Sequence, residues 1–144
     1  MRSSSLVLLL LLAACGPDVT SWKGTWKGSA VVTAGRAPEV YQGTLVVSDG
    51  ARFEASAVSG ATTFTCALTA ATADASTVTF TVPAACDLVA NPADGCTRKV
   101  TVNAASASQT AQGVEGAANG RLATTCTGAS STAVDFALTF SGTR

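Results

Sequence analysis

A period-two alternation of apolar and polar residues recurs along the chain, and it limits the possible folds more than any other feature. In one stretch, Val78, Phe80 and Val82 alternate with three threonines. Such alternation predicts a strand with one packed face and one wet face, as in antiparallel sheets. The pattern predicts about eight strands, near residues 25–33, 41–48, 52–57, 63–70, 77–82, 99–104, 121–126 and 134–141.

A meander of this kind has to close into a barrel or fold over as a sandwich, because its apolar face needs cover. We expect one all-β domain over residues 22–144, built as a closed or partly open up-and-down barrel, with a β-sandwich as the alternative. Two connections look long: Pro83 to Gly95, and Ala105 to Ala118, which is either a long hairpin loop or an extra strand. Turn formers mark shorter connections at Ser48-Asp49-Gly50, Ser59-Gly60 and Asn119-Gly120.

The first residues follow the order of a secretory signal. Arg2 supplies a positive charge, an apolar run extends from Leu6 to Leu12, and the small residues Ala13 and Ala14 come next. The run is much shorter than the roughly 20 residues that a membrane-spanning helix needs. We therefore expect residues 1–14 to be an export signal that is removed.

The residues Leu12-Ala13-Ala14-Cys15 resemble the lipobox of bacterial lipoproteins. The resemblance implies a diacylglycerol on the sulfur of Cys15, cleavage before that residue, and acylation of the new amine, for example by palmitate. Two or more acyl chains hold a protein stably on a membrane. Residues 15–21 are then a short tether, whose Gly16–Ser21 part reaches at most about 20 Å. In this family an Asp after the cysteine retains the protein at the inner membrane, so Gly16 implies the outer membrane of a diderm bacterium.

Four further cysteines remain, and an even number in an exported chain predicts two disulfides. Of the three possible pairings we favour Cys66–Cys86 with Cys96–Cys126. A hairpin that places Val100 opposite Leu122 also places Cys96 opposite Cys126. The main alternative closes one loop through Cys86–Cys96 and joins Cys66 to Cys126.

The sequence contains no histidine, which excludes imidazole-based catalysis and imidazole zinc sites. Without a CxxC pair we expect no metal. Asp87 and Asp94 are candidates for a carboxylate pair, or for a Ca²⁺ site together with Asn91. The run Asn91 to Gly95 is more typical of a turn, so we expect no enzyme and no cofactor.

The charges are balanced, with nine Lys and Arg against nine Asp and Glu, and loss of Arg2 leaves the mature chain one charge negative. Nucleic acid binding needs clustered cations. The only adjacent basic pair is Arg98-Lys99, so we expect a solvated surface and no nucleic acid partner.

Gly24-Thr25-Trp26, at the start of the first expected strand, resembles the G-x-W signature of lipocalins and related calycin barrels. The resemblance implies that Trp26 closes one end of a barrel and that a basic residue near the end of the last strand packs over it. Arg144 has the strand parity of Phe136 and Phe140, which places it beside Trp26. The alternative is an ordinary core position for Trp26.

Together these features predict a membrane-anchored envelope lipoprotein. Its domain is expected to be a non-catalytic binding module for an apolar or envelope-derived ligand, held in a cup lined by Ala, Gly, Thr, Val and Phe. The alternative is a structural or protein-interaction lipoprotein with a filled core. The expected partners are the membrane, through lipid on Cys15, and an apolar small molecule or an envelope protein.

Overall fold

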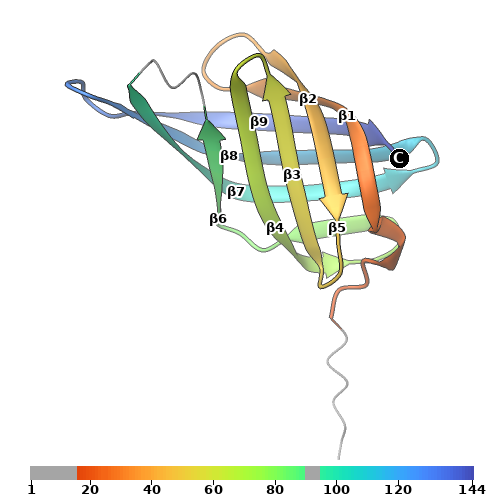
Figure 1. Cartoon of the computed structure of the whole chain (residues 1–144). Helices are drawn as coiled ribbons and strands as arrows, with labels where there is room; N and C mark the ends of the chain where they lie inside the picture. The colour runs from red at the N-terminus through yellow and green to blue at the C-terminus, as the bar shows by residue number, and fades with distance from the viewer. Residues whose placement is uncertain (1–15, 90–94) are drawn as a thin grey trace, which may run out of the picture.

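The chain forms a β-barrel, shown in Figure 1. The computed structural model describes residues 16–89 and 95–144. Within these ranges one short 3₁₀ turn, η1 (Thr20–Trp22), precedes nine strands. The strands are β1 (Gly24–Thr33), β2 (Glu39–Val47), β3 (Arg52–Ser59), β4 (Thr62–Ala73), β5 (Thr77–Phe80), β6 (Ala84–Val89), β7 (Cys96–Thr110), β8 (Gly113–Cys126) and β9 (Thr132–Thr143).

The sheet closes on itself because β9 pairs with β1 and every other strand pairs antiparallel with its neighbours. β5 and β6 share one position between β4 and β7, with β5 at one end of these strands and β6 at the other. Nine strands therefore fill eight barrel positions. The predicted all-β, up-and-down barrel is confirmed, and the β-sandwich alternative is wrong, because one ladder runs around the whole barrel and leaves no second sheet.

The chain between Pro83 and Gly95 contains a strand, and the prediction of one long loop there is wrong. β6 pairs with both β4 and β7, so its backbone groups are hydrogen-bonded on both sides. The preceding Pro83 has no N–H to donate, which suits a break between β5 and β6. Asp87 consequently lies on a strand, opposite Thr65 and Lys99.

β7 and β8 form a long hairpin that includes the stretch from Ala105 to Ala118. These residues continue the two strands, and the turn falls at Ala111 and Gln112. The predicted turn at Asn119-Gly120 is wrong. Gly120 lies in the middle of β8, where a Cβ would collide with the carbonyl oxygen of Thr101, so glycine is needed there for a close approach of strands.

A β-bulge between Val102 and Ala104 changes which residues of β7 face inward. Before the bulge, Val100 and Val102 are buried as predicted. Beyond it Ala104 is exposed, contrary to the simple alternation, and Ala107 is buried instead.

Both predicted disulfides are confirmed. The buried Cys66–Cys86 disulfide joins the neighbouring strands β4 and β6. Cys96–Cys126 joins β7 to β8 at the end of their hairpin that lies opposite the turn. The predicted register is also confirmed, with Val100 opposite Leu122 and Cys96 opposite Cys126.

The described chain starts at one end of the barrel (Figure 1), and large side chains fill the interior at that end. Trp22 and Phe53 are fully buried there, with ring centroids 5.9 Å apart, and Phe53 packs edge-on against Phe80 at 5.0 Å. Val19 is also buried, so packing into the barrel begins before residue 22. None of the described helical segments is long and apolar enough to cross a bilayer.

Candidate ligand-binding site

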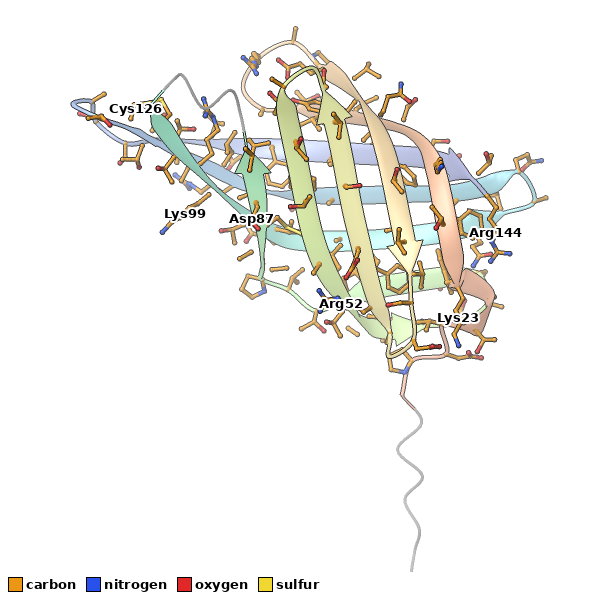
Figure 2. The ribbon with its side chains drawn as sticks, viewed as in Figure 1. Lys23, Arg52, Asp87, Lys99, Cys126 and Arg144 are labelled. Carbon is orange, nitrogen blue, oxygen red and sulfur yellow. A yellow bond between two sulfur atoms is a disulfide. The ribbon has the colours of Figure 1, made fainter. Side chains whose placement is uncertain are left out.

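One end of the barrel, here called the closed end, is sealed by Trp22, Trp26 and Arg144. The guanidinium carbon of Arg144 lies 4.4 Å from the centroid of the Trp26 ring. The same guanidinium donates hydrogen bonds to the backbone carbonyls of Ser21 and Lys23. The predicted position of Arg144 beside Trp26 is confirmed, and it ties the end of β9 to the residues that lead into β1. Figure 2 shows Arg144 and Lys23 near this end and Cys126 at the far end of the hairpin.

The β4–β5 turn holds the indole of Trp22 in place. Trp22 Nε1 donates to the carbonyl oxygen of Asp74 at 2.7 Å, and Trp26 Nε1 donates to the carbonyl of Trp22 at 3.0 Å. The Asp74 carboxylate accepts hydrogen bonds from the backbone N–H and the hydroxyl of both Ser76 and Thr77. The backbone bonds, first from Ser76 and then from Thr77, are the main reason why the pKa of Asp74 falls to about 2.

The opposite end of the barrel is hollow. A cavity of about 380 Å³ opens between the β1–β2 connection, the β3–β4 turn and the outer parts of β6 to β9. We call it the mouth cavity. Its lining is Val32, Ala34, Arg36, Ala37, Glu39, Tyr41, Ala57, Thr62, Phe64, Leu88, Arg98, Val100, Leu122, Phe136 and Leu138.

A smaller cavity of about 80 Å³ lies deeper in the barrel, and we call it the inner cavity. Ala57, Phe64, Phe136 and Leu138 line both spaces, so the two adjoin. The rest of the inner lining is dominated by apolar residues, including Leu45, Leu68, Phe80, Val102 and Phe140.

Two glycines allow the rings of Phe136 and Phe140 to lie close to the backbone of other strands. A Cβ on Gly43 would lie 2.8 Å from the Phe140 ring, and one on Gly120 would lie 2.8 Å from the Phe136 ring. Both rings therefore lie against bare backbone: Phe136 against the neighbouring strand β8, and Phe140 against β2, the strand beyond β1. Both residues line the inner cavity, and Phe136 also lines the mouth cavity.

Polar groups of the mouth cavity cluster on β2 and the turn before it. Arg36 Nη2 lies 2.7 Å from Glu39 Oε1, and the hydroxyl of Tyr41 donates to Glu39 Oε2 at 2.8 Å. Burial of the ring, followed by the hydrogen bond to Glu39, raises the pKa of Tyr41. Sequence reasoning missed this group; the one available sign was the inward parity of Tyr41, the only tyrosine in the chain.

Arg98 contributes a second cation from the other side of the barrel. It lies on β7 two residues before the buried Val100, so it shares the inward face and is only partly exposed. Its neighbour Lys99 faces outward and is exposed. The sequence-based interpretation treated the pair as ordinary surface charge, because a basic pair alone does not show which member points inward.

The residues considered for carboxylate chemistry are not brought together in the described part of the chain. Asp87 is exposed on the outer face of β6, while Asn91 and Asp94 lie outside the described residues, as does Cys15. Among residues 16–89 and 95–144, no group of three or more Asp, Glu, Cys or His side chains has a geometry for a metal.

Fold and site together define a class: an up-and-down β-barrel with two disulfides, one sealed end and one open apolar cavity. No protein-family model matches the chain, and no curated protein matches it. A structure comparison found a protein of unknown function from the DUF3598 family of Nostoc punctiforme, 20% identical, with a TM-score of 0.28. The match covers 86% of this chain and 49% of that protein, so the chain spans about half of its length.

Proposed function

We propose that the barrel is a non-catalytic binding module that holds an apolar ligand in the mouth cavity. The observation that carries the proposal is the cavity of about 380 Å³ above a sealed barrel floor. Ligand pockets commonly have volumes of about 300–1,000 Å³ and a mostly apolar lining with a few polar groups. The mouth cavity matches this description, since apolar side chains form most of its wall and Arg36, Glu39, Tyr41, Thr62 and Arg98 supply the polar groups.

The cavity also explains why the two barrel ends differ in sequence. Trp22, Phe53 and Phe80 fill the closed end, whereas Ala57, Val100 and Leu122 are among the residues that line the mouth cavity. An apolar ligand that enters the open mouth cavity removes its apolar lining from water, which favours binding.

Two measurements test the proposed binding. Organic extraction of the purified protein, followed by mass spectrometry, is expected to release a co-purified apolar compound. Titration with the neutral probe N-phenyl-1-naphthylamine is expected to give a saturable rise in fluorescence with one site per chain. Absence of both results contradicts the proposal.

The lipid anchor belongs to the same proposal. Its support is the resemblance of Leu12 to Cys15 to a lipobox behind an apolar run. Expression of the full chain in a diderm bacterium is expected to give a mature protein that starts at Cys15, carries acyl mass and fractionates with the outer membrane. Cys15→Ser is the control and is expected to lose the acyl mass. A wild-type product that still begins at Met1 without acyl mass contradicts the anchor.

A second candidate function is the binding of another envelope protein, and exposed valines favour it. Val40, Val58 and Val89 are 61%, 44% and 60% exposed on the outer face of β2, β3 and β6 near the mouth. Cross-linking in intact cells tests this candidate. If one protein is captured by the wild type and not by the Val40→Asp, Val89→Asp double variant, the result supports binding of a partner protein. If the double variant still captures that protein, the result contradicts a role for these valines.

A further inference from the structure

We infer that two copies of this chain pair side by side through the outer faces of β2, β3, β4 and β6, with both mouths pointing in the same direction. The inference goes beyond the proposed ligand binding and does not depend on it. It names a second copy of the chain as the partner of the exposed valines. Three observations support it: the distribution of these valines, the match of large and small side chains about a two-fold axis, and the position of the charges.

The exposed valines lie mainly on one side of the barrel. Among the described residues, six large apolar side chains are exposed, and four of them lie on the outer face of β2, β3 and β6: Val40, Val46, Val58 and Val89. None of the six lies on β7 or β8, which pass behind β2, β3 and β4 in Figure 1. Exposed apolar side chains gathered on one face are typical of a surface that another protein covers.

β3 separates a side of this face with a large residue from a side with small residues. Glu54 of β3 has Val46 of β2 on one side and Ala67 of β4 on the other. Ala67 and the exposed Ala85 of β6 line a shallow groove of about 370 Å³. A two-fold axis along β3 places the β2 side of one copy over the β4 side of the other. Val46 of each copy then lies over Ala67 and the groove of the other copy.

The residues around Val58 match about the same axis. Val58 lies on β3, so it meets Val58 of the second copy and forms an apolar contact at the centre. Its cross-strand neighbours are Gln42 on β2 and Thr63 on β4. The axis places the Gln42 amide of one copy opposite the Thr63 hydroxyl of the other. These groups are a donor and an acceptor for each other, so the pairing does not leave them without partners.

The charges select the parallel arrangement. Arg52 Nε donates a hydrogen bond to Glu54 Oε1 at 2.9 Å on the outer face of β3. In the parallel arrangement this pair meets the same pair of the second copy, so each carboxylate keeps a guanidinium beside it. An antiparallel arrangement centred on Ser56 would instead place Glu54 against Val58, where the carboxylate loses water without gaining a partner.

The parallel arrangement also agrees with the proposed anchor, because it places both closed ends on the same side, as two chains held in one bilayer require. The eight residues of β3 extend roughly 26 Å, and four strands cover a width of about 15 Å, so each copy offers roughly 400 Å² in projection. A standard interface buries about 800 Å² per partner. Pairing is therefore weak in dilute solution, and anchoring in one bilayer favours it by raising the effective concentration.

Cysteine cross-linking of the full chain in bacterial membranes tests the pairing. Two differently tagged copies are produced together, one with Val46→Cys and the other with Ala67→Cys, and the membranes are mildly oxidised. A disulfide needs Cβ atoms about 3.5–4.5 Å apart, so we expect at least about fivefold more mixed disulfide than disulfide between identical copies. Ala117→Cys, on the exposed outer face of β8, is the matched control and is expected to form no linked dimer.

The same pair of chains tests the central contact. Val58→Asp in both copies is expected to reduce the mixed disulfide at least about tenfold, because it places two carboxylates opposite each other at an apolar contact. Val58 is 44% exposed, so the change does not disturb the barrel core. Ala117→Asp is the control with no expected change. The yield of the two native disulfides shows that both variants fold.

Three outcomes overturn the inference. Disulfides between identical copies that exceed the mixed disulfide contradict the parallel arrangement. Linking of either cysteine to a different protein, without the mixed disulfide, shows that the face binds another partner. Mixed disulfide that persists in the Val58→Asp variant contradicts the central contact. Ligand binding is tested separately by the fluorescence titration, so failure of the pairing leaves the proposed function intact.

Discussion

Arg144 lies over the indole of Trp26, with its guanidinium carbon 4.4 Å from the ring centroid. The contact joins the end of the last strand to the start of the first, so it lies at the seam where β9 pairs with β1. Because Arg144 also donates to the carbonyls of Ser21 and Lys23, it secures the segment that carries Trp22 into the barrel.

Arg144→Ala is expected to lower the free energy of unfolding by about 1–2 kcal/mol, through loss of the cation–π contact and of hydrogen bonds to the two carbonyls. Arg144→Lys keeps the charge but loses the planar group, and its loss is expected to be smaller. Urea unfolding followed by tryptophan fluorescence measures both. An Arg144→Ala protein as stable as the wild type contradicts the sealing role.

Asp74 predicts a specific dependence of stability on acid. Its pKa of about 2 in the folded protein lies below the ordinary value near 3.9 in an unfolded chain. The carboxylate therefore stabilises the fold fully above about pH 4, and the contribution disappears as the pH falls toward 2. The difference in urea midpoint between wild type and Asp74→Asn is expected to shrink over this range. A difference that stays constant down to about pH 2 contradicts the role of the charged carboxylate.

The Cys96–Cys126 disulfide is expected to be reduced before the Cys66–Cys86 disulfide. Cys66 and Cys86 are 5% and 7% exposed, whereas Cys96 and Cys126 are both partly exposed at the end of a hairpin. Exchange with a reductant needs access to a sulfur atom. Brief reduction of the folded protein, followed by alkylation and peptide mapping, should label Cys96 and Cys126 first. In denaturant, all four cysteines should be labelled at similar rates. Labelling of Cys66 and Cys86 before Cys96 and Cys126 in the folded protein contradicts the prediction.

The proposed anchor predicts which way the mouth points. Val19 packs at the closed end, so only residues 16–18 separate it from Cys15, a reach of about 10 Å. The nine residues of β2 extend roughly 30 Å, which keeps the mouth away from the anchoring bilayer. Ligand would then enter from the aqueous side.

Lipid-attached quenchers test this orientation on vesicles that carry the acylated protein. A fluorophore on Ser48→Cys, at the β2–β3 turn of the closed end, is expected to be quenched strongly. The same fluorophore on Ala61→Cys, at the β3–β4 turn beside the mouth, is the matched comparison and is expected to be quenched little. Stronger quenching at residue 61 than at residue 48 contradicts the orientation.

The alternation of residues was enough to predict an all-β meander with one packed face, because most inward positions follow strict parity from Trp26 to Phe140. It left the barrel and the sandwich both open, since the choice depends on the pairing of β9 with β1. The hairpin register followed from Val100 and Leu122 because the ladder from Cys96 to Val102 has no irregularity. The bulge after Val102 was hidden, since the alanines and serines that follow it, from Ala104 to Ser108, give no contrast between inner and outer faces. The prediction of a turn at Gly120 was wrong because the sequence does not distinguish a glycine required for close approach of two strands from one required in a turn.

The mouth cavity was beyond prediction from the sequence for a related reason. Small inward residues such as Ala57 and Gly43 are compatible with a filled core or a hollow one. The outcome depends on where the rings of Phe136 and Phe140 lie across the barrel, which is set by contacts between strands far apart in the chain. The inward direction of Arg98 likewise became visible only once the parity of β7 was fixed by its partners.

The most direct test of the central claim is a titration of two neighbouring variants with N-phenyl-1-naphthylamine. Leu88 lines the mouth cavity, and the next residue, Val89, is 60% exposed. Leu88→Trp should fill the cavity and weaken the probe at least tenfold, which corresponds to about 1.4 kcal/mol, while Val89→Trp should bind as the wild type does. Equal binding by all three proteins would show that the apolar ligand does not enter the barrel.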